Sequence, residues 1–313
     1  MATRDYLFFL CATAALFILS GCVAKDPLPQ GKVYPSTSIN VPFISPRQDL
    51  CGSTSIQMVA QYWQANRNYS PKLSLQELDQ RTLLPLKGGT LQVELVSTAR
   101  ANGLIAYPLE PNFDALLSEL SAHHPVIVLI NRSYSWYPMW HYIPVNGYDT
   151  TRKEFLTHFS DQPNEPIGIK TFAELWKRSE YWGVVLLPPG EIPASATSKK
   201  FLRSVYELEK VGMVEEAIRS YQSALMRWPE DSDIHFILGN SYSRVDRLSE
   251  AEESYRRFLL RNPNHPLALN NLALLLSKTG RKTEGLALLD NAVSKDPEVQ
   301  KMLRETREEI LKK

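Results

Sequence analysis

The sequence has few cysteines, no block of like charge and no compact set of metal ligands. Only three of its 313 residues are cysteines, and its six histidines are scattered. Neither an HExxH motif nor a pair of CxxC motifs occurs, so the sequence offers no ligand spacing typical of a metal site. Lysine and arginine number 35 against 34 acidic residues, and no basic segment supplies the phosphate contacts that nucleic-acid binding needs. We therefore expect no metal, no cofactor and no nucleic-acid partner.

The composition fits two soluble domains behind an apolar leader. The hydrophobic content of 43% is sufficient for ordinary cores, and the length predicts two domains. Residues 6–20 form an apolar run of signal-peptide length, too short for a comfortable membrane span. The Leu19-Ser20-Gly21-Cys22 segment that follows resembles the bacterial lipoprotein box. The resemblance implies a signal peptide over residues 1–21 and lipidation of Cys22, with an uncleaved anchor or a plain secretory signal as the alternative.

A tether follows the leader. Cleavage and lipidation also determine how many free cysteines the mature chain keeps. Residues 22–40 contain proline and serine and predict a tether between membrane and fold. Val23 is not acidic, which by similarity to lipoprotein sorting rules favours the outer membrane, facing the periplasm. Cys11 leaves with the leader and Cys22 carries lipid, so Cys51 is the sole thiol in an oxidising compartment. Such a thiol is either buried as a small apolar side chain or reactive.

Residues 41–189 show helical patterns first and strand patterns later. A capping box begins a helix at Ser74, Thr90 and Gly103 bracket a second helix, and a third follows Asn112. The strand patterns cover residues 125–131, 141–149, 154–160 and 183–189. This order predicts an α+β domain whose helices pack on an antiparallel sheet.

Cys51 stands at or just before a predicted helix N-terminus. Gly52 and three small hydroxyl residues precede apolar residues at helical spacing from Ile56 to Trp63. The free N–H groups and the dipole at such a position favour a thiolate and lower the pKa of a cysteine. Gly52 lets a substrate carbonyl approach the backbone amides, which supplies part of an oxyanion hole.

A thiolate needs a base, which must come from elsewhere in the chain. His123 and His124 fit a solvated helix end, and His158 lies in a strand pattern from which it can point outward. His141 opens a strand, and the hairpin that follows can bring Asp161 back to the imidazole. Asp161 would then fix the orientation of the imidazole, as the third member of a catalytic triad does.

Three segments resemble, in order and spacing, the signature blocks of the papain-like cysteine peptidases that include the double-glycine leader peptidases of bacteriocin exporters. They are "QDLCGSTSIQMVAQYW", "HYIPVNGYD" and "FSDQPNEPIGIKTFAELWKR". The resemblance covers residues 41–189 and is closest to the stand-alone branch, because no exporter or ATP-binding domain follows. It implies a papain-like α+β fold with Cys51 as nucleophile, His141 as general base and acid, and Asp161 as the orienting carboxylate.

Two positions depart from the family pattern. The family's glutamine donor to the oxyanion is commonly six residues before the cysteine, where this chain has Ser45. Gln48, three residues before the cysteine, is the candidate instead, and otherwise the oxyanion hole depends on backbone amides. Asn164 is the alternative to Asp161 for the third role, because Gln162 follows Asp161 where the family often has proline.

An aromatic loop over residues 133–140 runs directly into His141. Trp136, Tyr137 and Trp140 in this loop, together with Gly52, are candidates for the substrate cleft. Packing of these aromatic side chains against the core of the domain is the alternative.

The C-terminal part repeats every 34 residues, which is the length of a tetratricopeptide repeat. The repeat follows a linker with proline, alanine and serine at residues 190–200. Its register is marked by Pro229, Pro263 and Pro297. Residues 201–297 resemble three tetratricopeptide repeats closed by a capping helix over residues 298–313, an all-α solenoid. The resemblance implies a surface that binds a protein partner.

Three cations share one position of the repeat: Lys210, Arg244 and Lys278. They are candidates for gripping carboxylates of a bound partner. The alternative is that they are helix C-terminal cations, which the helix dipole favours.

These patterns together predict a lipid-anchored envelope cysteine peptidase that acts on a peptide or protein, with repeats that recruit a partner or substrate. A non-catalytic scaffold lipoprotein is one alternative. A thiol transpeptidase or amidase acting on cell-wall peptides is another.

Overall fold

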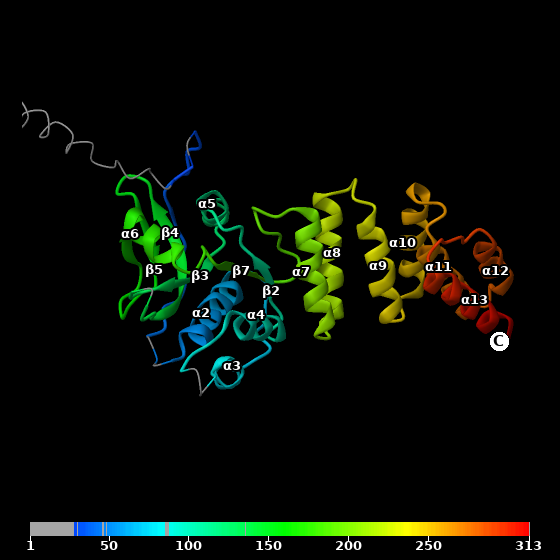
Figure 1. Ribbon diagram of the computed structural model, residues 1–313, viewed down its shortest axis with the longest axis horizontal. Helices are drawn as coiled ribbons and strands as arrows, with labels where there is room; N and C mark the ends of the chain where they lie inside the picture. Colours follow the sequence, from blue (N-terminus) through cyan, green and yellow to red (C-terminus); the bar gives the residue numbers. More distant parts are fainter. Residues whose placement is uncertain are drawn as a thin grey trace, which may run out of the picture.

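The computed structural model describes residues 28–29, 31–45, 47, 49–84, 88–134 and 136–312. The predicted signal peptide, Cys22 and Gln48 lie outside these residues. The described chain forms a sheet-containing α+β domain followed by a row of helices, as the sequence predicts (Figure 1). No helix in this part of the chain is both long and apolar enough to cross a membrane.

One antiparallel sheet organises the first domain. Its strands are β1 (Thr37–Ser38), β2 (Ile105–Pro108), β3 (Val126–Asn131), β4 (Trp140–Asp149), β5 (Glu154–Thr157), β6 (Glu165–Gly168) and β7 (Gly183–Leu187). The strand order is β2-β7-β3-β4-β5-β6, and β1 pairs with the far end of β4. The central β3 is buried along its whole length, which fits its continuous apolar sequence. The long β4 pairs with β3 over residues 140–145 and with β5 and β1 towards its other end.

Five helices surround this sheet. They are α2 (Cys51–Asn66), α3 (Leu75–Thr82), α4 (Gln92–Ala101), α5 (Phe113–Ser121) and α6 (Ile169–Lys177). Figure 1 shows α2, α3 and α4 grouped below the strands as drawn, with α5 above them. The capping box at Ser74 and the Asn112 cap are confirmed by their side-chain hydrogen bonds. The cap expected at Thr90 is wrong, because Leu91 is the N-cap of α4 and makes no side-chain cap.

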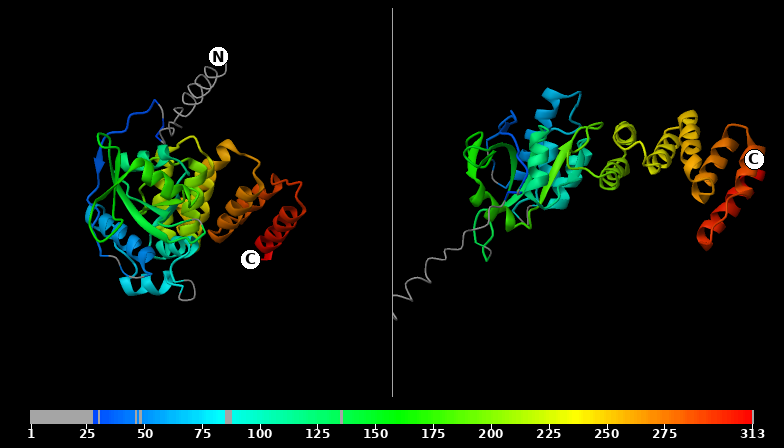
Figure 2. Two further views of the ribbon diagram at one scale, coloured as in Figure 1. Left: turned by 60° about the vertical axis from the view of Figure 1, so that its left-hand side comes forward. Right: turned by 90° about the horizontal axis from the view of Figure 1, so that it is seen from above.

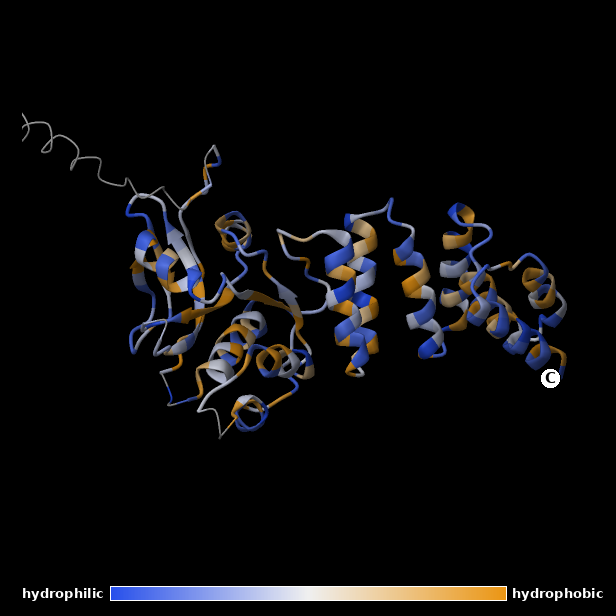
Figure 3. Ribbon diagram, viewed as in Figure 1, coloured by the Kyte–Doolittle hydropathy of each residue, from blue (hydrophilic) through white to orange (hydrophobic). Residues whose placement is uncertain are grey.

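The core joins the two sides of the sheet through large buried side chains. Trp63 of α2 donates from Nε1 to the carbonyl oxygen of Leu186 in β7 at 2.7 Å. On β5, Phe155 contacts Phe113 of α5 and Phe172 of α6, with ring centroids 5.9 and 4.5 Å apart. Figure 3 shows apolar residues running through the centre of this domain and along single sides of the later helices.

Paired helices form the second part of the chain. They are α7 (Ser198–Lys210), α8 (Val214–Arg227), α9 (Asp233–Arg244), α10 (Leu248–Arg261), α11 (Pro266–Lys278), α12 (Lys282–Asp290) and the closing α13 (Pro297–Lys312). Gly239 allows close packing within a pair, since a Cβ there would lie 2.6 Å from the ring of Tyr255. The row extends away from the sheet domain in every view (Figures 1 and 2).

The segment between the two parts is held by a buried carboxylate. Glu119 at the end of α5 accepts hydrogen bonds from the backbone N–H groups of Ala194 and Ser195, at 3.1 and 2.7 Å. Glu119 also pairs with Nδ1 of His124 at 2.7 Å. The expectation that His124 is a solvated helix-end residue is therefore wrong, because His124 is buried and its ring lies beside that of Trp63. Arg100 of α4 and Glu207 of α7, 3.6 Å apart, add a contact across the junction.

Candidate active site

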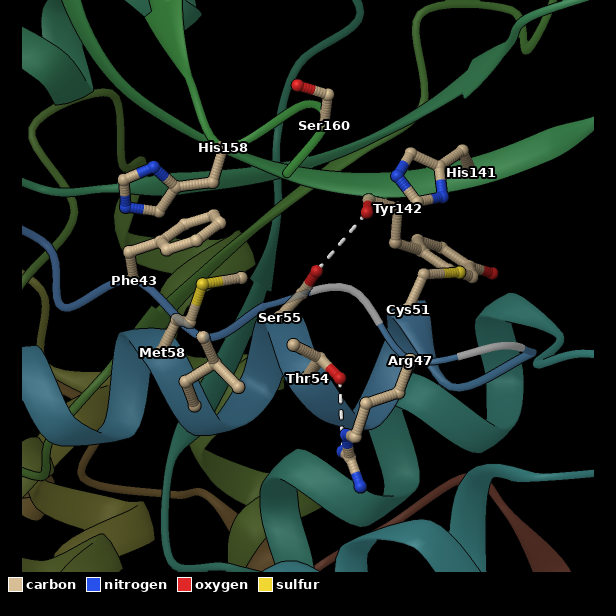
Figure 4. Close-up of a pocket in the computed structure, with 11 residues that line it drawn as sticks. Phe43, Arg47, Cys51, Thr54, Ser55, Met58, His141, Tyr142, His158 and Ser160 are labelled. Atoms are coloured by element: carbon tan, nitrogen blue, oxygen red, sulfur yellow. Dashed lines mark hydrogen bonds between the residues drawn. The ribbon is translucent and has the colours of Figure 1, made fainter. Parts of the chain in front are cut away.

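Cys51 and His141 line one small cavity of about 30 Å³. Cys51 is the first residue of α2, and His141 is the second residue of β4. Figure 4 shows the thiol and the imidazole facing each other at the start of the helix. The other walls include Phe43, Arg47, Thr54, Met58, Tyr142 and His158. The fold thus brings together the two residues that the sequence pairs across 90 positions, at a cavity with room for roughly one water molecule.

Small hydroxyl residues let α2 approach β4 closely. Gly52, Ser53, Thr54 and Ser55 are all buried in the first turns of the helix. The hydroxyl of Ser55 donates to the carbonyl oxygen of Tyr142 at 3.3 Å. Because Tyr142 directly follows His141, this bond fixes the helix that carries the thiol against the strand that carries the imidazole.

A second set of contacts anchors the chain just before Cys51. The guanidinium of Arg47 donates to both carboxylate oxygens of Asp79 on α3, at 2.5 and 2.9 Å. The same group donates to the hydroxyl of Thr54 at 3.0 Å. Ser53 donates to the carboxylate of Asp79 at 2.6 Å. Sequence reasoning missed Arg47, because no local pattern connects it with an aspartate 32 residues away.

The imidazole of His141 is neutral in the physiological range. Burial and the nearby positive charge of Arg132 lower its pKa, and a hydrogen bond to the backbone carbonyl of Phe159 opposes them, with a net pKa of about 4 against 6.5 for an unperturbed histidine. The Arg132 guanidinium lies 4.8 Å from the ring centroid of Phe159, which holds the cation beside the site. With one ring N–H donated to Phe159, the other nitrogen can accept a proton.

The thiol of Cys51 is protonated rather than ionised in this arrangement. Burial raises its pKa above the ordinary value of 9.0, although the amides of Tyr142, Cys51 and Gly52 act to lower it. The lowered pKa expected at the helix start is therefore not found. Loss of water around the sulfur outweighs the favourable N–H groups. The resting pair is a thiol beside a neutral imidazole.

Neither Asp161 nor Asn164, the two residues proposed to orient His141, is among the residues that line the cavity. Asp161 is exposed and accepts a hydrogen bond from the Ser160 hydroxyl at 3.3 Å. Its role as orienting carboxylate stays a prediction. Asn164 is directed elsewhere, since its backbone N–H donates to Nδ1 of His158 at 3.2 Å and its side chain accepts from Asn146. In the described chain, the group that bonds to the His141 ring is the Phe159 carbonyl.

His158 is a structural residue of the cavity wall. Its Nδ1 accepts from the Asn164 N–H, so Nε2 carries the proton that is donated to the carbonyl oxygen of Val41 at 2.9 Å. Its side chain is buried and its pKa is lowered by burial. The outward orientation expected from the strand pattern is wrong, because the chain before α2 covers this side of β5.

Gly52 faces a side chain rather than open space. A Cβ at Gly52 would lie 2.6 Å from Oγ1 and 2.9 Å from Cγ2 of Thr90. The space on the Cβ side of Gly52 is therefore occupied by the Thr90 side chain. The glycine allows the segment before α4 to pack against the start of α2.

Comparison with known families covers both parts of the chain. Residues 38–183 match the Peptidase_C39 like family, and residues 238–299 match a tetratricopeptide repeat family. The chain joins a C39-like peptidase domain to tetratricopeptide repeats. The peptidase-family resemblance and the tetratricopeptide resemblance are thereby confirmed.

Individual relatives cover different parts of the chain. A putative C39-like peptidase from Bacillus anthracis has a TM-score of 0.40 and 15% identity, covering 49% of this chain and 98% of that one. The Yersinia enterocolitica type III secretion translocator chaperone SycD has a TM-score of 0.35 and 19% identity, covering 37% and 92%. Human protein O-mannosyl-transferase TMTC2 is 32% identical over 100 residues. The matched region is 30% of this chain and only 12% of that curated relative.

The three aromatic candidates for the substrate cleft, Trp136, Tyr137 and Trp140, are not among the residues that line the small cavity. Trp136 and Tyr137 are 80% and 65% exposed, at the tip between β3 and β4. Trp140 is 50% exposed and lines a second, larger cavity beside the first. Packing against the core is therefore excluded for these three side chains. Their contact with a substrate stays a prediction.

The three repeat cations each end the first helix of a pair. Lys210 ends α7, Arg244 ends α9 and Lys278 ends α11. Arg244 binds the buried Glu209 at 2.9 Å, and Lys210 pairs with Glu207 at 2.8 Å. These positions match the helix C-terminal alternative, and two of the charges already have partners in the chain. Within the described residues, no group of histidine, cysteine and acidic side chains is placed to hold a metal ion.

Proposed function

We propose that the protein is a cysteine peptidase of the bacterial envelope that cleaves a peptide or amide bond through a thioester on Cys51. The observation that carries this proposal is the placement of the Cys51 thiol and the neutral His141 imidazole in one cavity. The match of residues 38–183 to the C39-like family supports it. The repeats support recruitment of a protein partner or substrate.

The resting protonation states define the first step. As Sγ of Cys51 attacks the substrate carbonyl carbon, the free nitrogen of His141 accepts the thiol proton. The backbone amides at the start of α2 stabilise the developing oxyanion, with Gln48 as a further candidate donor. His141 then gives its proton to the leaving amine, and the C–N bond breaks to leave a thioester. Water, deprotonated by His141, hydrolyses the thioester and restores the thiol.

The anchor and the location belong to the same proposal. Lipidation of Cys22 would hold the protein at the outer membrane, facing the periplasm, with the segment before β1 as tether. Cell fractionation of the wild type and of Cys22→Ser tests this, because only the wild type should partition with membranes. Equal partitioning of both proteins contradicts a lipid anchor at this residue.

A peptide-library experiment tests the chemistry. The full-length protein in detergent is incubated with a synthetic peptide library in H₂¹⁸O, alongside Cys51→Ala and His141→Gln, and new termini are found by mass spectrometry. Hydrolysis by the wild type alone, with ¹⁸O in the new carboxyl groups, supports the peptidase. Joined peptides without ¹⁸O indicate a transpeptidase. An absence of products with the folded wild type leaves the scaffold alternative and overturns the proposal.

A further inference from the structure

A cavity of about 400 Å³ lies beside the Cys51 site and is lined by three separate segments. Its lining residues come from residues 90–92 at the start of α4, from Leu129 of β3 with Trp140 and Tyr142 of β4, and from residues 178–180 after α6. The volume falls in the range of roughly 300–1,000 Å³ that is typical of ligand sites. We call this cavity the side groove.

The side groove adjoins the candidate active site. Tyr142 lines both cavities. Trp140 and Tyr142 stand on either side of His141 in β4. On the opposite side, Thr90 contacts Gly52, the residue after Cys51. The side groove therefore adjoins the start of α2, which carries Cys51.

Four of the nine described side chains that line the side groove are apolar or aromatic. Leu129 and Tyr142 are cross-strand partners, so their side chains lie together on one face of the sheet. Leu91 and Trp140 are 44% and 50% exposed and both line the side groove. Because Leu129 and Tyr142 are buried, Leu91 and Trp140 supply most of the exposed apolar surface, and an aromatic or long aliphatic group is the ligand that such a surface favours.

Two polar residues that line the side groove, Arg178 and Ser179, form hydrogen bonds within the protein. Arg178 donates to the carbonyl oxygen of Ser133 at 2.6 Å and to that of Asn131 at 3.3 Å. Ser179 donates to the carbonyl oxygen of Leu129 and to that of Trp176. These bonds occupy Arg178 and Ser179, while Gln92 and Glu180 add exposed polar groups to the rim.

Strand geometry favours a polypeptide over a membrane as the occupant. The segment that leads to the proposed anchor enters at β1, whose residues pair with Gly147 and Tyr148 near the far end of β4. Trp140 begins the same strand, so roughly 25 Å of strand separates it from the entry point at about 3.3 Å per residue. The side groove therefore lies away from the anchored end, next to the proposed nucleophile.

We propose that the side groove is a specificity subsite that takes a bulky apolar side chain, aromatic or leucine-like, within two residues of the cleaved bond. This assignment rests on the proposed peptidase function. It distinguishes the chain from the double-glycine specificity that the sequence resemblance suggests, because glycine would leave the groove unfilled. Loss of a filling side chain from a substrate is expected to lower kcat/KM by about 100-fold.

The library experiment, read by residue position, tests the subsite. The wild type should cut beside phenylalanine, tyrosine, leucine or methionine, and Trp140→Ala and Leu91→Ala should lose that preference. Val93→Ala is the matched control, since Val93 is 65% exposed near Leu91 and does not line the side groove. Cutting without an apolar preference, or cutting at double glycine, overturns the subsite and leaves the peptidase standing.

A binding measurement keeps the subsite testable if no peptide is cut. Saturation-transfer NMR of the Cys51→Ser protein should show contact with N-acetyl-phenylalanine amide and none with N-acetyl-glycine amide. Trp140→Ala in the same background should reduce the signal at least several-fold, with thermal melting used to confirm its fold. Equal signals from both amides, or no effect of Trp140→Ala, overturn the subsite whatever the outcome for catalysis.

Discussion

The hydroxyl of Ser55 donates a hydrogen bond to the carbonyl oxygen of Tyr142 at 3.3 Å. Ser55 lies one helical turn after Cys51, and Tyr142 directly follows His141. This single side-chain bond therefore spans the two elements that carry the thiol and the imidazole. Its geometry links the stability of the α2–β4 contact with the alignment of the candidate site.

Ser55→Ala should weaken both properties. Ser55 is buried, so the lost bond is expected to lower the free energy of unfolding by about 1 kcal/mol, and the freed helix should reduce kcat/KM further. Urea unfolding and peptide cleavage measure the two effects. Ser97→Ala is the control, because its exposed hydroxyl bonds only to the carbonyl of Glu94 within α4. Equal effects of the two substitutions contradict a linking role for Ser55.

The pKa of His141 should determine the pH at which kcat/KM falls on the acidic side of its pH profile. With a pKa of about 4, the imidazole stays neutral until the solution is well below pH 6.5, so kcat/KM should fall only near pH 4. Arg132→Gln removes a positive charge that lowers this pKa and should move this fall to higher pH. Arg152→Gln, on the turn at the other end of β4, should leave the profile unchanged. An acid limb near pH 6.5 in the wild type contradicts the buried neutral imidazole.

The same pKa affects stability with a definite sign. Between pH 6.5 and about 4, the unfolded chain binds a proton at His141 that the folded chain does not. The free energy of unfolding should therefore decrease as the pH falls through this window, by up to about 1.4 kcal/mol per pH unit. Unfolding of the wild type and of His141→Gln at pH 7 and pH 4.5 measures it, and the variant should lose less stability on acidification.

The raised pKa of Cys51 predicts slow alkylation of the free protein. At pH 7 the thiolate fraction should lie below that of an ordinary cysteine, so iodoacetamide should modify Cys51 more slowly than a cysteine-containing model peptide. The rate should rise steadily above pH 9, and His141→Gln should change it little. Mass spectrometry of the Cys51 peptide separates this thiol from the others. Faster modification than the model peptide would indicate a thiolate paired with imidazolium.

Gly52 and Thr90 should be energetically coupled. The Cβ of Gly52→Ala would meet the Thr90 side chain at 2.6 to 2.9 Å, which should lower the free energy of unfolding by about 1–3 kcal/mol. Thr90→Gly should relieve part of this loss in the double variant. Gly168→Ala is the control, because no atom lies within 4 Å of its added Cβ. Strict additivity of the Gly52 and Thr90 substitutions in urea unfolding contradicts the contact.

Arg244 and Lys278 should differ despite their shared repeat position. Arg244 compensates the buried Glu209, which also accepts from the Tyr221 hydroxyl at 3.1 Å. Arg244→Ala is expected to cost about 2 kcal/mol, because it leaves a buried carboxylate without its cation. Lys278 is exposed at the end of α11, so Lys278→Ala should change the free energy of unfolding by less than about 0.5 kcal/mol. Equal effects in thermal and urea unfolding would mean that the Arg244 bond adds no stability.

Much of the architecture could be predicted because its signals are local. The capping residues Ser74 and Asn112, the apolar run of β3 and the 34-residue repeat all act within short windows of the chain. The sequence patterns of β6 and α6 were weaker indications of a strand and a helix. Pro166 interrupts the short β6 pattern, although Ile169, Phe172 and Trp176 of α6 do fall on one helical face.

The sequence by itself determined the order of Cys51 and His141, the helix start at the cysteine and the register of the repeats, because periodicity and residue type encode them directly. Only the tertiary structure decided the protonation states of the pair, the partner of the His141 ring and the occupation of the space beside Gly52 by Thr90. Desolvation depends on which distant segments cover a group, and no local pattern encodes that. The same reason explains why Arg47 and the side groove became visible only in the folded chain.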